Sequence, residues 1–327
     1  MEDRFDFAVL GPIPRDRITT HEGEVVEKFG CALYTAAALS ALSGEGSRVV
    51  PVTHVRKADR EAIQALLAEL PHVETHHVRD AADQGDVITL TYKDQNERVE
   101  RQTGFMNPIT PADVDDLLDV DAFVCVPITD FEVPLATLQH IKANSGALVV
   151  LDAHGPTNVC TRHGERALKF WIERDLWLPH IDILKMNRDE AGCCWFASGY
   201  ERDELDRVGE LPMEDLPKLA THCLERGVKA LYVTLDAHGC AVYFNGPDGA
   251  LQSHIVECVP VERVVDTTGC GDSFAAGLAF GYLRTGDYVR ACRYGNAMGA
   301  QRCTSTELDV YHDLERTERQ LEKVYGS

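Results

Sequence analysis

The sequence has few basic residues for its length. Lysine and arginine together number 32, against 53 aspartate and glutamate residues, which gives a formal net charge of −21 over 327 residues. Because so acidic a chain repels phosphate backbones and anionic headgroups, nucleic acid and anionic membrane are poor partners. The charge balance still permits a phosphate site, since one pocket can be positive on a negative surface.

Long apolar runs are also missing. No window approaches 18 uninterrupted apolar residues, which excludes a transmembrane helix, and the opening MEDRFDFAVLG lacks the segments of a signal peptide. The 11 cysteines contain no CxxC pair, and their odd number does not fit a disulfide framework. We therefore expect a cytoplasmic protein with reduced thiols.

Two common nucleotide-binding loops are missing as well. The chain has no Gly-Lys dipeptide, so it has no P-loop. A dinucleotide fingerprint needs GxGxxG after an early strand, whereas GCGDSF lacks the third glycine and lies near the C-terminus. These absences disfavour a P-loop enzyme and a dinucleotide-binding oxidoreductase.

What the sequence does contain is an alternation of apolar runs with helical segments. The apolar runs, rich in Val, Ile and Leu, are 7–10, 49–52, 122–126, 147–151, 183–186 and 230–234. The helical segments between them include 31–42, 58–70 and 213–226. Runs without strict alternation are typical of strands covered on both faces, and intervening helices make crossovers. The pattern predicts an α/β protein with a mainly parallel sheet.

One region departs from this pattern. Residues 86–92 alternate apolar and polar side chains, a polar turn follows at 93–97, and the segment 98–102 comes after it. This pattern predicts a β-hairpin with one solvent-exposed face, appended to the main sheet as a flap. The acidic stretch 200–210 is expected to be a solvated surface loop.

The strongest chemical signal is the segment 264–283, VVDTTGCGDSFAAGLAFGYL. Gly269 and Gly271 allow a tight turn with bare N–H groups at the start of a helix, where the helix dipole favours anions. Such a turn can hold a phosphoryl group in transfer, and Asp272 within it can accept a proton from an attacking hydroxyl. An ordinary helix start with a capping acid remains the alternative at this point.

This segment closely resembles the signature of the ribokinase-like, PfkB-type carbohydrate kinases, which usually reads DTTGAGD; here Cys270 replaces the alanine. The resemblance implies one domain over residues 1–327, a three-layer αβα sandwich with a mainly parallel central sheet and a small β lid contributed by 86–102. It also implies an anion hole from the backbone of Gly269, Cys270 and Gly271, with Asp272 as general base.

Two further segments resemble the family's nucleotide site. In KMNRDE, Asn187 and Glu190 match an N-x-x-E motif that would hold Mg²⁺ through water, although the same pattern also fits a helix capping box. In YVTLDAHGC, Thr234 and Gly239 match a nucleotide loop in which Asp236 replaces the usual glycine; an ordinary hairpin is the alternative.

Two residues of the signature segment itself complete the predicted nucleotide and cation site. Thr267 is also assigned to the nucleotide. Some family members bind a monovalent cation, K⁺, beside the signature, and Asp266 is the matching residue for it.

The substrate site of the family is matched near the N-terminus. Asp16 falls where an aspartate commonly binds substrate hydroxyls, and two carboxylate oxygens suit a pair of hydroxyls. Gly30 and Thr35 fall in the next substrate segment, where members usually show G-G-x-x-x-N. Cys31 replaces the second glycine and Thr35 the asparagine, which argues against ribokinase itself.

We therefore expect an ATP- and Mg²⁺-dependent kinase that phosphorylates a hydroxyl of a small sugar-like molecule, and that dimerises through its lid. A nucleoside kinase is one alternative, for which Tyr92 and Phe105 are the candidate stacking residues. A catalytically silent ligand sensor on the same fold is another. The closely spaced His72, His76 and His77 are expected to belong to a polar loop rather than to a metal site.

Overall fold

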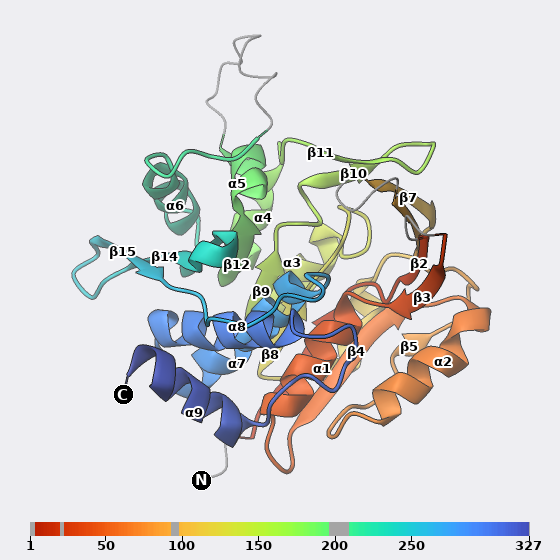
Figure 1. The fold of residues 1–327 in the computed structure, drawn as a ribbon. Coiled ribbons are helices and arrows are strands. Elements are labelled where there is room, and N and C mark those ends of the chain that lie inside the picture. The colour runs from red at the N-terminus through yellow and green to blue at the C-terminus, as the bar shows by residue number, and fades with distance from the viewer. Residues whose placement is uncertain (1–3, 20–22, 93–97, 196–208, 327) are drawn as a thin grey trace.

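A computed structural model describes residues 4–19, 23–92, 98–195 and 209–326 of the chain. Its centre is a nine-stranded sheet in the order β15-β14-β13-β12-β9-β8-β1-β4-β5 (Figure 1). The strands are β1 Asp6–Leu10, β4 Arg48–His54, β5 Val78–Arg79, β8 Ala122–Cys125, β9 Leu148–Asp152, β12 Ile183–Asn187, β13 Ala230–Thr234, β14 Cys240–Asn245 and β15 Leu251–Val256. All neighbours from β5 to β13 pair in parallel, and only β14 and β15 are antiparallel.

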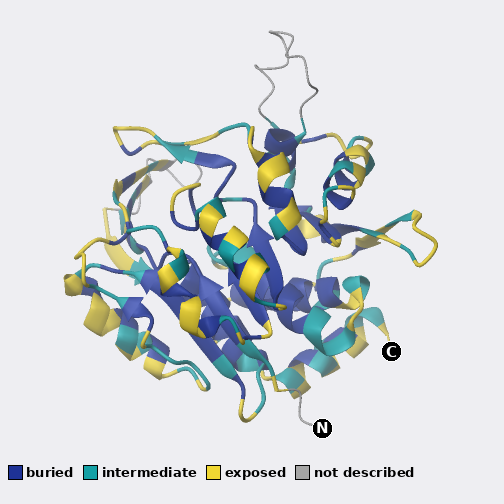
Figure 2. Cartoon of the chain, turned by 180° about the vertical axis from the view of Figure 1, so that it is seen from behind, coloured by how far each residue is buried: buried dark blue, intermediate teal, exposed yellow. Residues whose placement is uncertain are grey.

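Helices cover both faces of this sheet. They are α1 Ala32–Leu42, α2 Lys57–Ala68, α3 Leu135–Asn144, α4 Arg174–Trp177, α5 Arg188–Cys194, α6 Leu216–Leu224, α7 Cys270–Thr285, α8 Tyr288–Arg302 and α9 Leu314–Tyr325. Alternate residues of one strand enter two separate cores: Phe123 packs with the cluster of α3, α5 and α6, whereas Val124 packs with that of α1, α7 and α8. The inner strands of the sheet, from β4 across to β13, are accordingly almost wholly buried, whereas the outer helix faces and the middle of the edge strand β15 are exposed (Figure 2). The predicted three-layer α/β architecture is confirmed.

A second, four-stranded sheet lies at one end of the molecule (Figure 1) and is called the lid sheet below. Its order is β3-β2-β6-β7, with β2 Arg15–Thr19, β3 Val25–Phe29, β6 Val87–Tyr92 and β7 Arg98–Gly104. The predicted hairpin is therefore present as β6 and β7, whereas β2 and β3 were not predicted as strands. The predicted turn at 93–97 and residues 200–208 of the acidic stretch lie outside the described residues.

A short hairpin, β10 Asn158–Cys160 and β11 Arg166–Leu168, contacts the lid sheet next to β7. The hairpin and β7 are joined by one isolated antiparallel β-bridge, between Glu165 and Arg101.

In the described part of the chain, no helix is long and apolar enough to cross a membrane.

Candidate active site

A cavity of about 300 Å³ opens at the carboxyl ends of the parallel strands, where the lid sheet meets the main sheet. Ligands of α/β sheets bind at this edge, because the loops and helix starts that follow the strands converge there. The lining combines residues that follow β9 and β12, residues of the lid sheet and the start of α7. They are Pro14, Asp16, Ile18, Lys28, Cys31, Ile88, Leu90, Glu100, Pro127, Ile128, Asp152, His154, Arg166, Lys185, Asn187, Glu190, Thr268, Gly271 and Asp272.

The signature turn begins α7 at this cavity. Gly269 has a φ of +84° and lies against the ring of Tyr34, which a built Cβ would approach to 2.2 Å, so glycine is required there. The N–H of Cys270 donates to the carbonyl oxygen of Thr267 at 3.2 Å, whereas the N–H groups of Gly271 and Asp272 have no partner among the described residues. Of the three amides implied by the resemblance, only that of Cys270 is already paired; those of Gly269 and Gly271 have no partner among the described residues, and the Asp272 amide, which was not predicted, is bare as well.

Asp272 lies in the first turn of α7 and faces the cavity. The Cys31 thiol lies 3.5 Å from its Oδ1, and the hydroxyl of Thr35 donates to its backbone carbonyl at 3.2 Å. Burial, reinforced by the neighbouring carboxylate of Asp152, raises the pKa of Asp272 to about 6. A carboxyl group with this pKa is largely ionised at neutral pH and remains basic enough to accept a proton.

A buried ion pair supports the same turn from the sheet. The ammonium of Lys185 on β12 donates to Asp152, the last residue of β9, at 2.7 Å, and both side chains are almost fully buried. A Cβ built on Gly271 would lie 2.9 Å from Nζ of Lys185, so the turn and the ammonium are in close contact. Burial opposes the charge on Lys185, but Asp152 and Glu190 outweigh it and raise its pKa. The site therefore holds a fixed positive charge next to the bare amides.

Asn187 and Glu190 form a complete capping box at the start of α5. The Asn187 side chain accepts from the Glu190 N–H, and Glu190 accepts from the Asn187 N–H, both at 2.8 Å. The other oxygen of Glu190 lies 2.9 Å from Nδ1 of His154. Each of these oxygens keeps a second lone pair, so the pair fits a hydrated Mg²⁺ bound through its waters. The capping box and the predicted metal role are thus compatible.

Asp16, on β2 of the lid sheet, lines the cavity. Its side chain is buried, and Oδ1 has no hydrogen-bond partner among the described residues. Burial raises the pKa of Asp16 to about 7, against the opposing effect of Lys28. A buried carboxylate oxygen without a partner is costly, which makes it a ready acceptor for a ligand hydroxyl.

The structure does not bring every sequence-predicted residue to the cavity wall. Those outside the lining are Gly30, Thr35, Thr234, Gly239, Asp266, Thr267, Gly269 and Cys270. Thr35 is fully buried behind Asp272, and Gly30 lies behind Asp16, whose Oδ2 a built Cβ would approach to 3.3 Å. Thr234 pairs in register with Asn187 on the neighbouring strand, so it ends at the same sheet edge. Asp266 binds Lys28 and Arg302.

Sequence reasoning missed several charged residues of the cavity. Asp152 and His154 directly follow a predicted strand, and polar residues at that position were an available signal. Arg166 comes from the short β10–β11 hairpin and donates to Glu100, to the carbonyl of Ile128 and to His154. No local pattern predicts that contact, because it joins the hairpin to the lid sheet over 66 residues.

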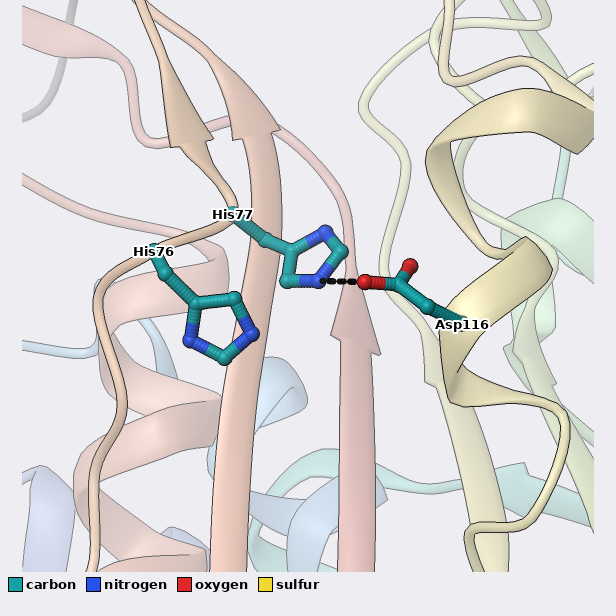
Figure 3. Close-up of side chains that lie close together, drawn as sticks. All are labelled: His76, His77 and Asp116. Atoms are coloured by element: carbon teal, nitrogen blue, oxygen red, sulfur yellow. Dashed lines mark ion pairs between the residues drawn. The ribbon is translucent and has the colours of Figure 1, made fainter.

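One group of side chains elsewhere has metal-ligand chemistry: His76, His77 and Asp116 lie close together (Figure 3). Nε2 of His77 lies 3.3 Å from Asp116, while its Nδ1 lies 3.3 Å from the guanidinium of Arg79. Because arginine can only donate, Nδ1 must accept and the proton resides on Nε2. In this tautomer the nitrogen that faces Asp116 therefore carries the proton.

Comparison with known proteins gives one family. The pattern of the family described as pfkB family carbohydrate kinase matches residues 81–310. The 2-dehydro-3-deoxygluconokinase of Bacillus subtilis (strain 168) is 33% identical over 130 residues, 39% of this chain and 37% of that protein. Adenosine kinase 1 of Arabidopsis thaliana is 30% identical over 100 residues, 31% and 27% of the two chains. The chain thus spans about a third of the length of these curated relatives.

Solved structures match over nearly the whole chain. Arabidopsis thaliana ribokinase, complexed with ribose and ATP, has a TM-score of 0.73 at 17% identity and covers 98% of this chain and 99% of its own. A pyrophosphate-dependent kinase in the ribokinase family, complexed with a pyrophosphate analog and myo-inositol, has a TM-score of 0.70 at 17% identity and covers 97% and 100%. At such identities the likeness establishes the ribokinase fold alone.

Proposed function

Because this chain belongs to the pfkB family of carbohydrate kinases, we propose that it transfers a phosphoryl group from ATP to a hydroxyl of a small sugar-like molecule. The observation that carries the proposal is the position of Asp272. Its carboxyl group faces a cavity next to the bare amides of Gly271 and Asp272, and Asp16 lines the same cavity with an unpaired oxygen. A base, an anion hole and a hydroxyl-binding group therefore share one cavity.

In this proposal the acceptor is held by the lid sheet and deprotonated by Asp272. Asp16 accepts hydrogen bonds from one or two acceptor hydroxyls with the oxygen that otherwise lacks a partner. Asp272 takes the proton of the attacking hydroxyl as the new oxygen–phosphorus bond forms, and the bond between the γ-phosphorus and the bridging oxygen of ATP breaks, so that ADP leaves. Closure of the lid sheet over the cavity excludes the water that would otherwise compete as acceptor.

Charge on the transferred group is balanced by this chain's own donors. The amides of Gly271 and Asp272 point from the start of α7, and the Lys185 ammonium lies beside them. Donors already in place when charge develops stabilise the transition state without reorganisation. Asn187 and Glu190 would hold the hydration shell of Mg²⁺, which supplies further positive charge to the donor phosphates.

The cavity lining favours a sugar or polyol over a nucleoside. In the described part of the chain, no Phe, Tyr or Trp lines the cavity, so a flat base has no stacking surface there. Of the two residues considered for stacking, Phe105 is exposed and outside the lining, and the side chain of Tyr92 lies outside the described residues.

The test is phosphate-donor consumption with a library of sugars, sugar acids, polyols and nucleosides, with ATP or pyrophosphate as donor. We expect Mg²⁺-dependent ATP consumption with at least one sugar-like acceptor. Turnover with nucleosides alone would favour the nucleoside kinase, and turnover with pyrophosphate alone would contradict the assigned donor. Ligand binding without turnover for any acceptor would indicate a silent sensor.

A further inference from the structure

A fully buried guanidinium lies beside the signature turn. Arg302, the last residue of α8, is 0% exposed and is the largest fully buried side chain described. Nη1 donates to the carbonyl oxygen of Ser305, Nη2 lies 3.4 Å from Oδ2 of Asp266, and the guanidinium carbon lies 4.3 Å from the centre of the Tyr34 ring. A buried charge is costly unless it is paired, so these contacts are what permit an arginine here.

The oxygens around Asp266 are already used by nitrogen donors. Oδ1 accepts from the Thr268 N–H at 2.9 Å, and Oδ2 accepts from Lys28 Nζ at 2.7 Å as well as from Arg302. The carbonyl of Cys303 accepts from the N–H groups of residues 265 and 266, at 2.8 and 3.3 Å. A carboxylate with neighbouring carbonyls is what a monovalent cation would need, but two protein cations already neutralise this carboxylate. The groups around Asp266 therefore do not fit a bound K⁺.

We propose that Arg302, together with Lys28, is the built-in replacement for a monovalent cation at Asp266, and that Arg302 positions the phosphoryl-binding turn. Asp266 begins that turn, and Tyr34, on which the guanidinium lies, supports Gly269 within it. Arg302 therefore supports the turn at two points: directly at Asp266, where the turn starts, and through Tyr34 at Gly269. The inference rests on the proposed function for its kinetic consequences, but its consequence for stability does not.

The first test uses the unmodified protein in KCl or in tetramethylammonium chloride at equal ionic strength. We expect the same Tm, within about 1 °C, and the same kcat, within about two-fold, because no cation site is left to fill. An increase in either Tm or kcat with K⁺, beyond these limits, would overturn the inference. If no acceptor is turned over at all, the proposed function fails, and the Tm comparison still decides the inference.

The second test is Arg302→Met, with Arg319→Met on the exposed face of α9 as the matched control. We expect Arg302→Met to lower kcat about 10–100-fold with a smaller change in the acceptor KM, and either guanidinium or K⁺ at about 50 mM to restore part of both kcat and Tm. Arg319→Met should resemble the unmodified protein in both salts. A folded Arg302→Met protein with unchanged kcat, or with no response to either cation, would overturn the positioning role. If Arg302→Met does not fold, Arg302→Gln, which is also uncharged, replaces it with the same readouts.

Discussion

At the scale of the residue, function depends on the environment of Asp272. Burial and the charge of Asp152 raise its pKa to about 6, whereas the Lys185 and His154 side chains lower it, so the group stays ionised at neutral pH. The same carboxyl group exposed on a surface would have a pKa near 4 and would be a weaker base. The sequence identifies the residue, but only the fold supplies the partners that tune it, because Asp152 and Lys185 come from two other strands.

The first prediction is a pH dependence. Because Asp272 acts as a base only when it is deprotonated, kcat/KM should rise about ten-fold per pH unit below about pH 6 and level off above it. The measurement is kcat/KM for the acceptor between about pH 4.5 and 8.5, with folding checked at each pH. A profile without a transition near pH 6, or with one near pH 4, would contradict the assigned environment.

The second prediction concerns stability. Because the pKa of Asp272 is higher in the folded state than in the unfolded chain, the folded state binds the proton more strongly between about pH 4 and 6. Stability from this group is therefore present at low pH and is lost as pH rises through about 6. Asp272→Asn, which has no charge to bury, should raise Tm at pH 8 by roughly 2–6 °C and leave it unchanged near pH 4. An equal or lower Tm at pH 8 would contradict the account.

At the scale of the element, the start of α7 requires a residue without a side chain. A Cβ on Gly271 would meet the Lys185 ammonium at 2.9 Å, and that ammonium is held in place by Asp152. Gly271→Val should therefore displace either the turn or the ammonium and lower kcat by at least about 10²-fold. Gly146→Val is the matched control, since a built Cβ at Gly146 meets nothing within 4 Å. Comparable turnover in the two variants would argue against a crowded anion hole.

The central elements could be predicted from the sequence because apolar runs and helical periodicity are local. The strands at 7–10, 122–126 and 183–186, the helix at 31–42 and the hairpin at 86–102 all correspond to observed elements. Strands β2 and β3 could not be found in this way. Their sequences, RDRIT and VVEKF, show no regular alternation. Strand β2 pairs with β6, about 70 residues away along the chain, and β3 joins the lid sheet through its pairing with β2.

The candidate site was only partly predictable for the same reason. Motifs identified Asp16, Asn187, Glu190 and Asp272, which all line one cavity. Other charged residues complete the electrostatics of the cavity, and tertiary contacts bring them together. Asp152, His154 and Lys185 lie at or just after the ends of predicted strands, a position that was a usable signal, whereas Lys28 and Arg166 had no such signal.

At the scale of the whole molecule, the lid sheet ends at β3, whose outer edge pairs with no other strand in the described part of the chain. On β3, Val25 and Val26 are 52% and 46% exposed, whereas the opposite edge, β7, is bridged by the β10–β11 hairpin. An open strand edge with exposed valines is a template for pairing with a second copy. We predict a dimer of twice 36.2 kDa by sedimentation velocity, shifted towards monomer by Val26→Asp. Ile255→Asp, on the edge strand β15, is the control; dissociation by that variant alone would place the interface elsewhere.

The central claim is that Asp272 is the base for phosphoryl transfer in the cavity beside the signature turn, and kcat of Asp272→Asn tests it most directly. The acceptor is the best one found for the unmodified protein, and Glu315→Gln, in the exposed first turn of α9, is the control. We predict that Asp272→Asn folds normally and loses about 10²–10⁴-fold in kcat, while Glu315→Gln loses nothing. Near-normal turnover by folded Asp272→Asn would contradict the account.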